Sequence, residues 1–363
     1  MNITFDSQIF QLQKHGGISR YFTELISALK IIDPKTAIKV KARFVRNDYL
    51  ISIKGIKVKK SPSFIPMKML LTLDSKRKNP RNVDLIHTTY YKREFLPSYP
   101  SIPNVITIHD MIPEDFGTLS PEEIQFSDKA EYVKNADGII CVSKFTKKRL
   151  LAHFPYLSIP ISVIPLATNL FRTFPVDLEL VNLKSRSKTF IYIGPRGNYK
   201  NFQLILFAAV RLRVLTNQSF EIIAVGGGKF SDEERVLIQN LGLVDFVKQT
   251  EMDDFQLSRA YSTSRALIFP SRMEGFGIPQ IEAFSFGCPV ISSGMGALKE
   301  FDNGISMKFD ANSPEDLADR MLEILKVSSR DFHDSAVAAI KHAKNFSWSE
   351  TARKTTDFYK LFT

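Results

Sequence analysis

The stretch 266–293 constrains the fold more than any other part of the sequence. It contains an apolar run (ALIF), a loop with two glycines (EGFG), a segment with helical spacing of apolar residues, and a second apolar run (PVISS). Pro279 falls in the first turn of the expected helix, where its missing N–H costs little, and Gly287 ends that helix. Strand, loop, helix and strand in this order are typical of an open α/β sheet, whose ligands bind at the carboxyl ends of the strands.

The loop in this stretch carries residue types that suit a sugar nucleotide. Gly275 and Gly277 allow backbone N–H groups to approach a ligand closely, and the N-terminus of the following helix favours an anion. Glu274 in the loop and Glu282 one turn into the helix are placed to accept hydrogen bonds from vicinal hydroxyls at two ends of one ligand. A sugar nucleotide has such hydroxyls on its ribose and on its sugar. The alternative is structural, with Glu274 as a helix cap and Glu282 as a solvated helix residue.

The spacing of the two glutamates also carries a family resemblance. Glu274, seven residues and then Glu282, around an EGFG core and ahead of GCPVISS, resemble the signature of family 4 retaining glycosyltransferases. The resemblance implies that Glu274 contacts the transferred sugar and that Glu282 contacts the ribose, with Gly275, Phe276 and Gly277 also at the donor. It implies the GT-B fold, in which two facing Rossmann-like α/β domains enclose a cleft, and a reaction that retains the anomeric configuration.

A second strand-to-glycine transition, TFIYIG, ends at Gly194 and is followed by PRGNYKN. Arg196 and Lys200 bracket this loop, so both can reach one anionic group. Two cations on a diphosphate leaving group supply what nucleotide-sugar chemistry needs without a metal, so we expect neither metal nor cofactor. The segment resembles the R-x3-K-N motif of the family, in which the pair holds the diphosphate. A solvated basic turn is the alternative.

The N-terminal part repeats the pattern of strand, glycine loop and helix. MNITF predicts a strand, 6–17 a loop, and 18–30 an amphipathic helix. Gly16 and Gly17 therefore precede a helix and predict an anion-binding start to a Rossmann-like domain, although the GxGxxG fingerprint of dinucleotide binding is absent. The string GGISRYFTEL resembles the mannosyltransferase-like branch of the family.

His109 follows an apolar run and lies where a strand is expected to end. A histidine in such a place is often structural. Thr107-Ile108-His109-Asp110 resembles the TxHD segment of the family, in which the histidine approaches the 6-hydroxyl and the anomeric region of the sugar. The resemblance therefore implies that His109 contacts the sugar from the opposite wall of the cleft.

Three regions of the chain follow from these patterns. Residues 1–168 are expected to form an acceptor-binding Rossmann-like domain, and residues 169–345 a nucleotide-sugar-binding one. The segment FSWSETARKTTDFYKLF resembles the family's C-terminal helix, so residues 346–363 are expected to cross back onto the first domain.

The positive charge of the chain is concentrated in residues 35–81. The whole chain carries +11, and this segment has 14 lysines and arginines against two acids, a net +12. Residues 38–60 alternate apolar and basic side chains, which predicts strands with one solvated face. Residues 61–78 suit either a helix in a membrane surface or a core helix with a basic end. Anionic lipid, a lipid-linked diphosphate and nucleic acid all fit such a patch, but its few aromatic residues argue against nucleic acid.

These observations predict a retaining, metal-independent hexosyltransferase. The donor expected first is GDP-mannose, with dTDP-rhamnose and UDP-sugars open, and the acceptor is a lipid-linked or other oligosaccharide in surface polysaccharide (O-antigen) biosynthesis. The absence of a signal peptide, and buried thiols expected at Cys141 and Cys288, favour a cytoplasmic protein, peripheral on the inner face of the cell membrane. The alternatives are a GT-B sugar-nucleotide epimerase and a nucleic-acid-binding protein. Linkage and oligomeric state stay open.

Overall fold

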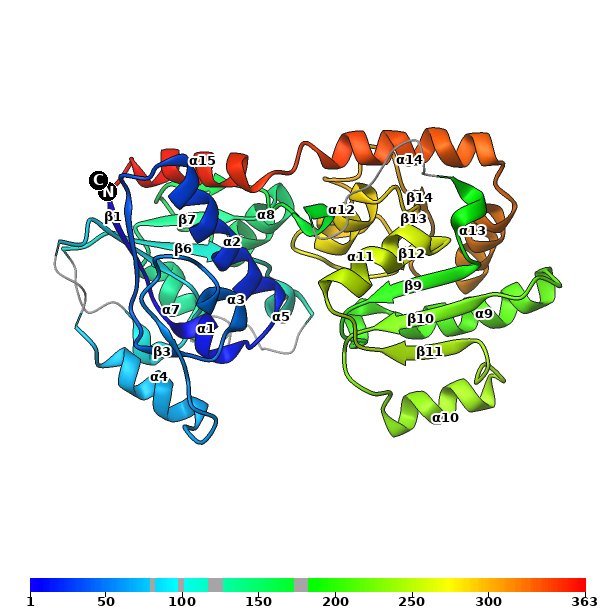
Figure 1. Cartoon of the computed structure of the whole chain (residues 1–363), viewed down its shortest axis with the longest axis horizontal. Coiled ribbons are helices and arrows are strands. Elements are labelled where there is room, and N and C mark those ends of the chain that lie inside the picture. Colours follow the sequence, from blue (N-terminus) through cyan, green and yellow to red (C-terminus); the bar gives the residue numbers. More distant parts are fainter. Residues whose placement is uncertain (79–81, 97–100, 117–126, 173–181) are drawn as a thin grey trace. The chain divides into compact units, whose positions relative to one another are not determined.

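A computed structural model describes residues 1–78, 82–96, 101–116, 127–172 and 182–363 (Figure 1). The chain forms two compact units. Unit 1 comprises Met1–Leu166 and Trp348–Thr363, and unit 2 comprises Ala167–Ser347. The C-terminal segment therefore returns to the unit in which the chain begins.

Unit 1 is built on a six-stranded parallel sheet of order β2-β1-β5-β6-β7-β8. Its strands, with the separate pair β3-β4, are β1 (Asn2–Phe5), β2 (Ala37–Val40), β3 (Phe44–Val45), β4 (Lys59–Lys60), β5 (Leu85–Thr88), β6 (Asn104–Ile108), β7 (Gly138–Cys141) and β8 (Ile161–Val163). Its helices are α1 (Gln8–Leu12), α2 (Gly17–Ile32), α3 (Asp48–Ile51), α4 (Met67–Ser75), α5 (Ile112–Asp115), α7 (Asp128–Lys134), α8 (Lys144–His153) and α15 (Trp348–Tyr359). Helices α7 and α8 pack on one face through an apolar cluster, and α2 and α15 pack together on the other.

Unit 2 has a second six-stranded parallel sheet, of order β11-β10-β9-β12-β13-β14. Its strands are β9 (Thr189–Ile193), β10 (Glu221–Val225), β11 (Val247–Thr250), β12 (Ala266–Phe269), β13 (Val290–Ser292) and β14 (Met307–Lys308). Its helices are α9 (Phe202–Leu215), α10 (Asp232–Asn240), α11 (Asp254–Thr263), α12 (Ile278–Ser285), α13 (Pro314–Lys326) and α14 (Ser329–Ala343). The strand order reverses between β9 and β12, and such a switch point is where ligands of doubly wound sheets bind.

The fold class expected from the sequence is confirmed: both units are parallel α/β layers. Helices α9, α10 and α13 cover one face of the unit 2 sheet through a continuous apolar core, while α12 packs with α14 elsewhere in the unit. Asp253 is the N-cap of α11, since its side chain accepts a hydrogen bond from the Gln256 N–H. Both cysteines are free and buried, as expected.

Two expectations for unit 1 are corrected. The predicted loop 6–17 contains α1, because the carboxylate of Asp6 accepts hydrogen bonds from the N–H and the side-chain amide of Gln8 and fixes the chain at the end of β1. The alternation in 38–60 yields β2 and two very short strands, and α3 interrupts it because the Asn47 side chain caps that helix at the Leu50 N–H.

Helix α4, expected over 61–78, combines features of the two alternatives: it has residues packed in the core, and it has exposed apolar side chains such as a membrane-surface helix has. Leu70 and Asp74 are buried against unit 1, whereas Met69 and Leu73 on the same helix are 51% and 53% exposed. Phe64, just before the helix, is 82% exposed. Among the described residues, no helix combines the length and the apolar character needed to cross a membrane.

Candidate active site

The switch point of unit 2 brings together two loops that lie far apart in sequence. One loop follows β9 and the other follows β12, and these strands are hydrogen-bonded neighbours. The Arg272 N–H donates to the Tyr199 carbonyl over 2.8 Å, and the Asn201 side chain donates to the Pro270 carbonyl over 3.4 Å. These bonds fix the loops against each other at the end of the sheet where a ligand is expected.

An ion pair links the two loops across the switch point. Lys200 Nζ lies 2.6 Å from Glu274 Oε1, and only 14% and 10% of the two side chains are exposed. The sequence predicted a role for each residue at the donor but did not predict their contact. Each side chain neutralises the charge of the other.

Arg196 is held by its own unit more tightly than a solvated basic turn would be. Its Nε donates to Glu234 over 2.8 Å, and its terminal nitrogens donate to the carbonyls of Gly226, Gly228 and Lys229 over 2.9–3.0 Å. Its side chain is 5% exposed. The guanidinium therefore anchors the glycine loop after β10, and a direct bond to a diphosphate requires it to release part of this network.

The glycines of the two loops have backbone conformations that other residues rarely adopt. Gly194 has φ 118° and Gly277 has φ 93°, and a Cβ on Gly277 would lie 2.4 Å from Leu298. Gly277 is the N-cap of α12, and no side chain caps that terminus. The Phe276 side chain, in contrast, is buried against Phe301 with 4.3 Å between ring centroids. Phe276 can therefore offer a ligand only its backbone.

Glu282 lies on α12 and is 6% exposed, so it is not the solvated helix residue of the alternative interpretation. Its Oε2 accepts a hydrogen bond from the hydroxyl of Tyr261 on α11, over 2.9 Å. A buried carboxylate oriented by a tyrosine suits the recognition of a hydroxyl pair such as that of a ribose.

The remaining predicted residues belong to unit 1. Gly16 precedes α2, but the Gln13 side chain already accepts a hydrogen bond from the Ser19 N–H at that terminus, over 3.0 Å. A Cβ on Gly16 would lie 2.4 Å from Gln13 Oε1, so a larger residue here would displace the side-chain end that caps α2. Gly17 has open space around it, so a role in anion binding stays a prediction for both residues.

His109 directly follows β6 and has an environment that keeps its imidazole neutral. Burial, partly offset by Asp110, lowers its pKa to about 4. The ring packs edge-on against Tyr21, with 5.1 Å between centroids. Its Nε2 is buried and has no hydrogen-bond partner among the described residues. A buried polar atom without a partner is costly unless a ligand or water satisfies it, which marks His109 as a candidate ligand contact.

Sequence patterns did not reveal two residues that orient the site. Glu234 binds Arg196, and Tyr261 binds Glu282. Glu234 is visible in the sequence only as the end of a capping box with Ser231, which the structure also contains. Nothing in the sequence around Tyr261 predicts a contact with Glu282; the pattern indicates only that Tyr261 lies in the helix before β12.

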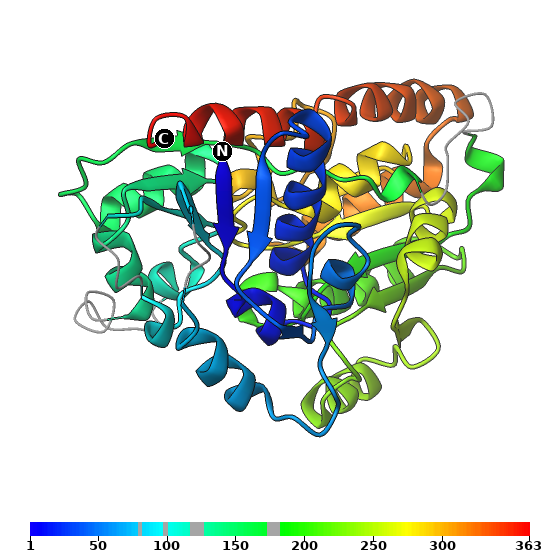
Figure 2. The ribbon, with the colours of Figure 1, turned by 60° about the vertical axis from the view of Figure 1, so that its left-hand side comes forward.

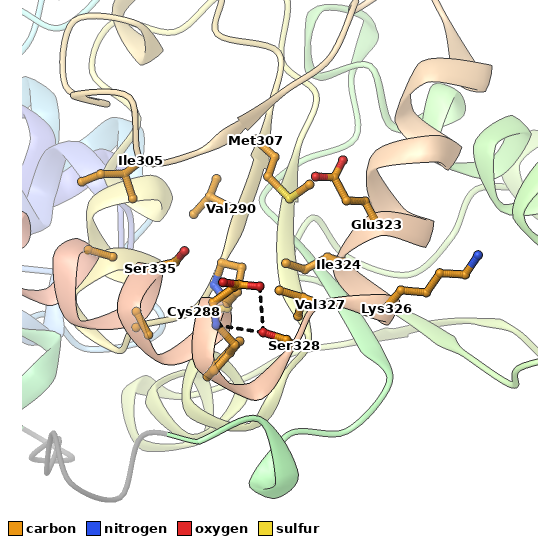
Figure 3. Close-up of a pocket in the computed structure, with 16 residues that line it drawn as sticks. Cys288, Val290, Ile305, Met307, Glu323, Ile324, Lys326, Val327, Ser328 and Ser335 are labelled. Carbon is orange, nitrogen blue, oxygen red and sulfur yellow. Dashed lines mark hydrogen bonds between the residues drawn. The ribbon is translucent and has the colours of Figure 1, made fainter.

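Two cavities in the described part of unit 2 differ in their relation to these loops. One, of about 590 Å³, is lined by Arg196, Asn201 and Arg272 and lies at the loops themselves. The other, of about 670 Å³, is lined by Cys288 and Val290 at the amino end of β13 and by residues of α13 and α14 (Figure 3). Since ligands of such sheets bind at the carboxyl ends, only the first belongs to the candidate site.

Comparison with known proteins agrees with this architecture. The family model "Glycosyltransferase Family 4" matches residues 15–172, and the model "Glycosyl transferases group 1" matches residues 178–346. The sucrose-phosphate synthase structure from Thermosynechococcus elongatus superposes with a TM-score of 0.72 at 19% identity, covering 99% of this chain and 98% of that one. Anabaena HepE, solved with UDP and glucose, superposes with a TM-score of 0.73 at 14% identity, covering 99% and 100%.

Curated relatives are similar in sequence at a lower level of coverage. The O-antigen chain mannosyltransferase B of Escherichia coli is 26% identical over 273 residues, which are 71% of this chain and 70% of the relative. The D-inositol 3-phosphate glycosyltransferase of Rhodococcus opacus is 24% identical over 314 residues, which are 79% and 69%. The fold and the matched models define a glycosyltransferase with the GT-B fold. More particularly, the two matched models, which cover successive parts of the chain, indicate a family 4 glycosyltransferase.

Proposed function

We propose that this glycosyltransferase moves a hexose from a nucleotide sugar to a glycan acceptor with retention of configuration and without a metal. The observation that carries the proposal is the Lys200–Glu274 pair at the switch point, beside the uncapped N-terminus of α12. Lys200 and the helix N-terminus suit a diphosphate, Glu274 suits sugar hydroxyls, and Glu282 suits a ribose. Among the relatives, the HepE structure holds UDP and glucose, which supports a nucleotide-sugar donor.

The reaction then needs little proton chemistry from the protein. The bond from the anomeric carbon to the diphosphate oxygen breaks, and a bond from that carbon to the acceptor oxygen forms on the same face. The acceptor proton passes to the departing phosphate oxygen. Charge that grows on the diphosphate is stabilised by Lys200 and by Arg196, if the latter turns from its carbonyl partners, and His109 contributes a neutral imidazole to the sugar.

GDP-mannose is the donor proposed first, and a lipid-linked oligosaccharide in surface polysaccharide assembly is the acceptor class. The similarity to an O-antigen mannosyltransferase supports both. Differential thermal stabilisation by a panel of GDP-, UDP- and dTDP-sugars tests the donor. At ~100 times its dissociation constant the correct donor adds roughly 2.7 kcal/mol to the free energy of unfolding. Equal stabilisation by all nucleotides would contradict a defined donor.

Incubation with the donor alone separates transfer from epimerisation. A transferase leaves the sugar of the intact donor unchanged, whereas an epimerase converts it without an acceptor. Chelator is expected to leave the transfer rate unchanged because cationic side chains take the place of a metal. A strict requirement for Mg²⁺ or Mn²⁺ would contradict this part of the proposal.

We further propose that unit 1 docks on an anionic membrane surface, on the inner face of the cell membrane. The exposed apolar side chains of Phe64, Met69 and Leu73 lie among the basic residues of α4 and the turn after it. Apolar insertion combined with ~1 kcal/mol for each Lys or Arg near anionic lipid is sufficient for reversible binding. The test is co-sedimentation with neutral and anionic vesicles at two salt concentrations.

Replacing Lys76, Arg77 and Lys78 by Ser is expected to reduce binding to anionic vesicles and transfer to a lipid acceptor, with donor affinity unchanged. The matched control removes the same charges from exposed positions on and just after α14 of unit 2, through Arg330→Ser, Lys341→Ser and Lys344→Ser. Equal loss in both triple variants, or equal binding to neutral vesicles, would contradict docking by α4. Steeply salt-dependent binding to RNA in place of vesicles would favour the nucleic-acid alternative.

A further inference from the structure

A chain of hydrogen-bonded polar side chains runs through the interior of unit 1. The Tyr359 hydroxyl on α15 lies 2.5 Å from His87 Nδ1 on β5, and His87 Nε2 lies 2.9 Å from the hydroxyl of Thr107 on β6. That hydroxyl lies 3.1 Å from the Tyr21 hydroxyl on α2. All four side chains are at most 2% exposed. Figure 2 shows α15 (red) meeting the end of α2 (blue).

The chain of bonds ends beside His109. The Tyr21 ring packs edge-on against His109 at 82°, and Trp348 of α15 packs on Tyr21 with 6.0 Å between centroids. Tyr21 is therefore fixed at its hydroxyl by Thr107 and on its ring by α15. His109 has no hydrogen bond at Nε2 among the described residues, so the rings of Tyr21 and Phe22 that pack on it contribute to the direction of its ring.

The tautomer of His87 sets the direction of the hydrogen bonds in this chain. Because the pKa of His87 is lowered to about 3 by burial and by the nearby His109, its imidazole is neutral and has one donor and one acceptor nitrogen. The Thr107 hydroxyl donates to His87 when Nε2 carries no hydrogen and then accepts from Tyr21; when Nε2 carries the hydrogen, Thr107 accepts from His87 and stays within hydrogen-bond distance of Tyr21. Fully satisfied buried networks of this kind hold their members in one arrangement.

We propose that Tyr21 is a positioning residue for His109, and that Tyr359 and His87 maintain the position of Tyr21 through Thr107. The inference rests on the proposed function in giving His109 a contact with the transferred sugar. It adds that helix α15 sets the geometry of a residue at the sugar. It does so through the hydroxyl of Tyr359, which contacts neither the nucleotide sugar nor the glycan acceptor.

The spectroscopic test uses the histidine ring signals of the full chain, in the wild type and in Tyr359→Phe. Tyr359→Phe removes one oxygen and leaves the ring, and we expect the His109 signal to shift together with that of His87. Thr355→Val is the matched control, because the Thr355 hydroxyl is buried on the same helix and donates only to the Thr351 carbonyl of that helix. An unchanged His109 signal in Tyr359→Phe, or an equal shift in Thr355→Val, would overturn the proposal.

The kinetic test is a double-mutant cycle with His109→Gln. Tyr359→Phe and Tyr21→Phe are each expected to lower kcat about fivefold, because one hydrogen bond contributes about 1 kcal/mol. Neither is expected to change the affinity for the bare nucleoside diphosphate. In the His109→Gln background the same changes are expected to have no further effect on kcat. Equal effects in both backgrounds would show a general structural role and overturn the proposal. Full activity of His109→Gln alone would refute the role of His109 in the proposed function, and the ring signals would still decide the positioning.

Discussion

The carboxyl ends of the two sheets use opposite kinds of chemistry. In unit 2 the side chains at the switch point are charged and paired, with Lys200 on Glu274 and Arg196 on Glu234. In unit 1 the polar side chains that are hydrogen-bonded in a chain beside His109, namely Tyr21, Thr107, His87 and Tyr359, are uncharged at neutral pH. The site of unit 2 therefore consists of ion pairs, whereas unit 1 has a neutral chain of hydrogen bonds beside His109.

The difference teaches how each unit can respond to a ligand. A buried ion pair costs desolvation energy, and a ligand that takes one partner must also satisfy the other, because an uncompensated buried charge is strongly destabilising. A neutral network has no such exchange available and is disrupted only by removing one of its members. We therefore expect changes in unit 2 to act on binding and turnover, and changes in unit 1 to act on geometry and on the response to acid.

Lys200→Ala is expected to have the largest effect. It removes a cation from the diphosphate and leaves Glu274 nearly buried without that partner. Loss of one such contact costs about 3–4 kcal/mol in the transition state, so kcat is expected to fall ~10²–10³-fold, with weaker donor binding and a lower Tm. Steady-state kinetics and thermal unfolding measure the two effects.

Lys248→Ala is the control for Lys200→Ala. Lys248 is paired with Glu221 in the same unit, but the two side chains are 65% and 30% exposed. Surface pairs contribute about 0–1 kcal/mol, so this variant is expected to keep its kcat and nearly all of its stability. Similar losses of kcat in both variants would mean that Lys200 acts through charge in general and not through the site.

Acid is expected to weaken unit 1 through His87. The pKa of His87 is about 3 in the folded protein and ~6.5 in the unfolded chain, so the unfolded state binds the proton first as pH falls. The stability that the neutral form provides is complete above pH ~6.5 and is lost as pH falls toward 3. At 1.36 kcal/mol per pH unit, about 3 kcal/mol is lost by pH 4.5.

Urea unfolding of wild type and His87→Asn at pH 7 and at pH 4.5 checks this expectation. The variant is expected to be less stable at pH 7 and to lose less stability between the two values. Raised pKa values of the buried carboxyls Asp6 and Asp74 act in the opposite direction, but they are common to both proteins and cancel in the difference. Parallel losses in the two proteins would contradict the assignment.

Glu282→Gln and Glu274→Gln are expected to separate nucleotide from sugar recognition. A hydrogen bond to a charged group contributes about 1.5–3 kcal/mol, so each change is expected to cost roughly 30-fold in the step that it serves. Glu282→Gln should weaken binding of the bare nucleoside diphosphate, whereas Glu274→Gln should bind it normally and fail in transfer. Calorimetry with the nucleotide and a transfer assay measure the two, and identical defects would show that the roles are misassigned.

Tyr261→Phe is expected to have the smallest effect. It removes the hydroxyl that donates to Glu282 Oε2 and leaves the stacked packing of the ring on Phe286 intact. A net loss of about 1 kcal/mol, or fivefold in nucleotide affinity, follows from one hydrogen bond. In a Glu282→Gln background the added loss should be smaller, and full additivity would show that Tyr261 does not act through Glu282.

Local patterns in the sequence were sufficient for most of the fold and for the position of the site residues along the chain. The apolar run ALIF is the strand 266–269, and the helix expected to begin around Pro279 and to end at Gly287 is α12, which begins at Ile278 and ends at Ser285. Helix α1 was not predicted because its buried glutamines bond to residues outside the helix, Gln8 to Asp6 and Gln11 to Asp74, and no periodicity reveals such contacts. Helix α14 was not predicted at all, although its apolar residues have helical spacing.

Contacts between distant residues were outside the reach of those patterns. Lys200 and Glu274 are 74 positions apart, and His87 and Tyr359 are 272 apart. Their meeting depends on which strands become neighbours and on where the chain returns. The motif at 196–200 predicted a cation pair for a ligand, whereas the structure shows Lys200 on the carboxylate of Glu274 and Arg196 on the carboxylate of Glu234 and a loop of carbonyls.

The return of α15 to unit 1 has a consequence for synthesis on the ribosome. Domains usually fold in the order in which they are made, but unit 1 cannot complete its core until residues 348–363 have emerged. Translation of the intervening unit, at ~5–20 residues per second, takes roughly 10–40 s. During that interval Gly138 lacks the Phe358 and Phe362 rings that cover it, and His87 lacks Tyr359. Unit 1 therefore has an incomplete core during this interval, and unit 2 is the first unit whose residues have all been synthesised.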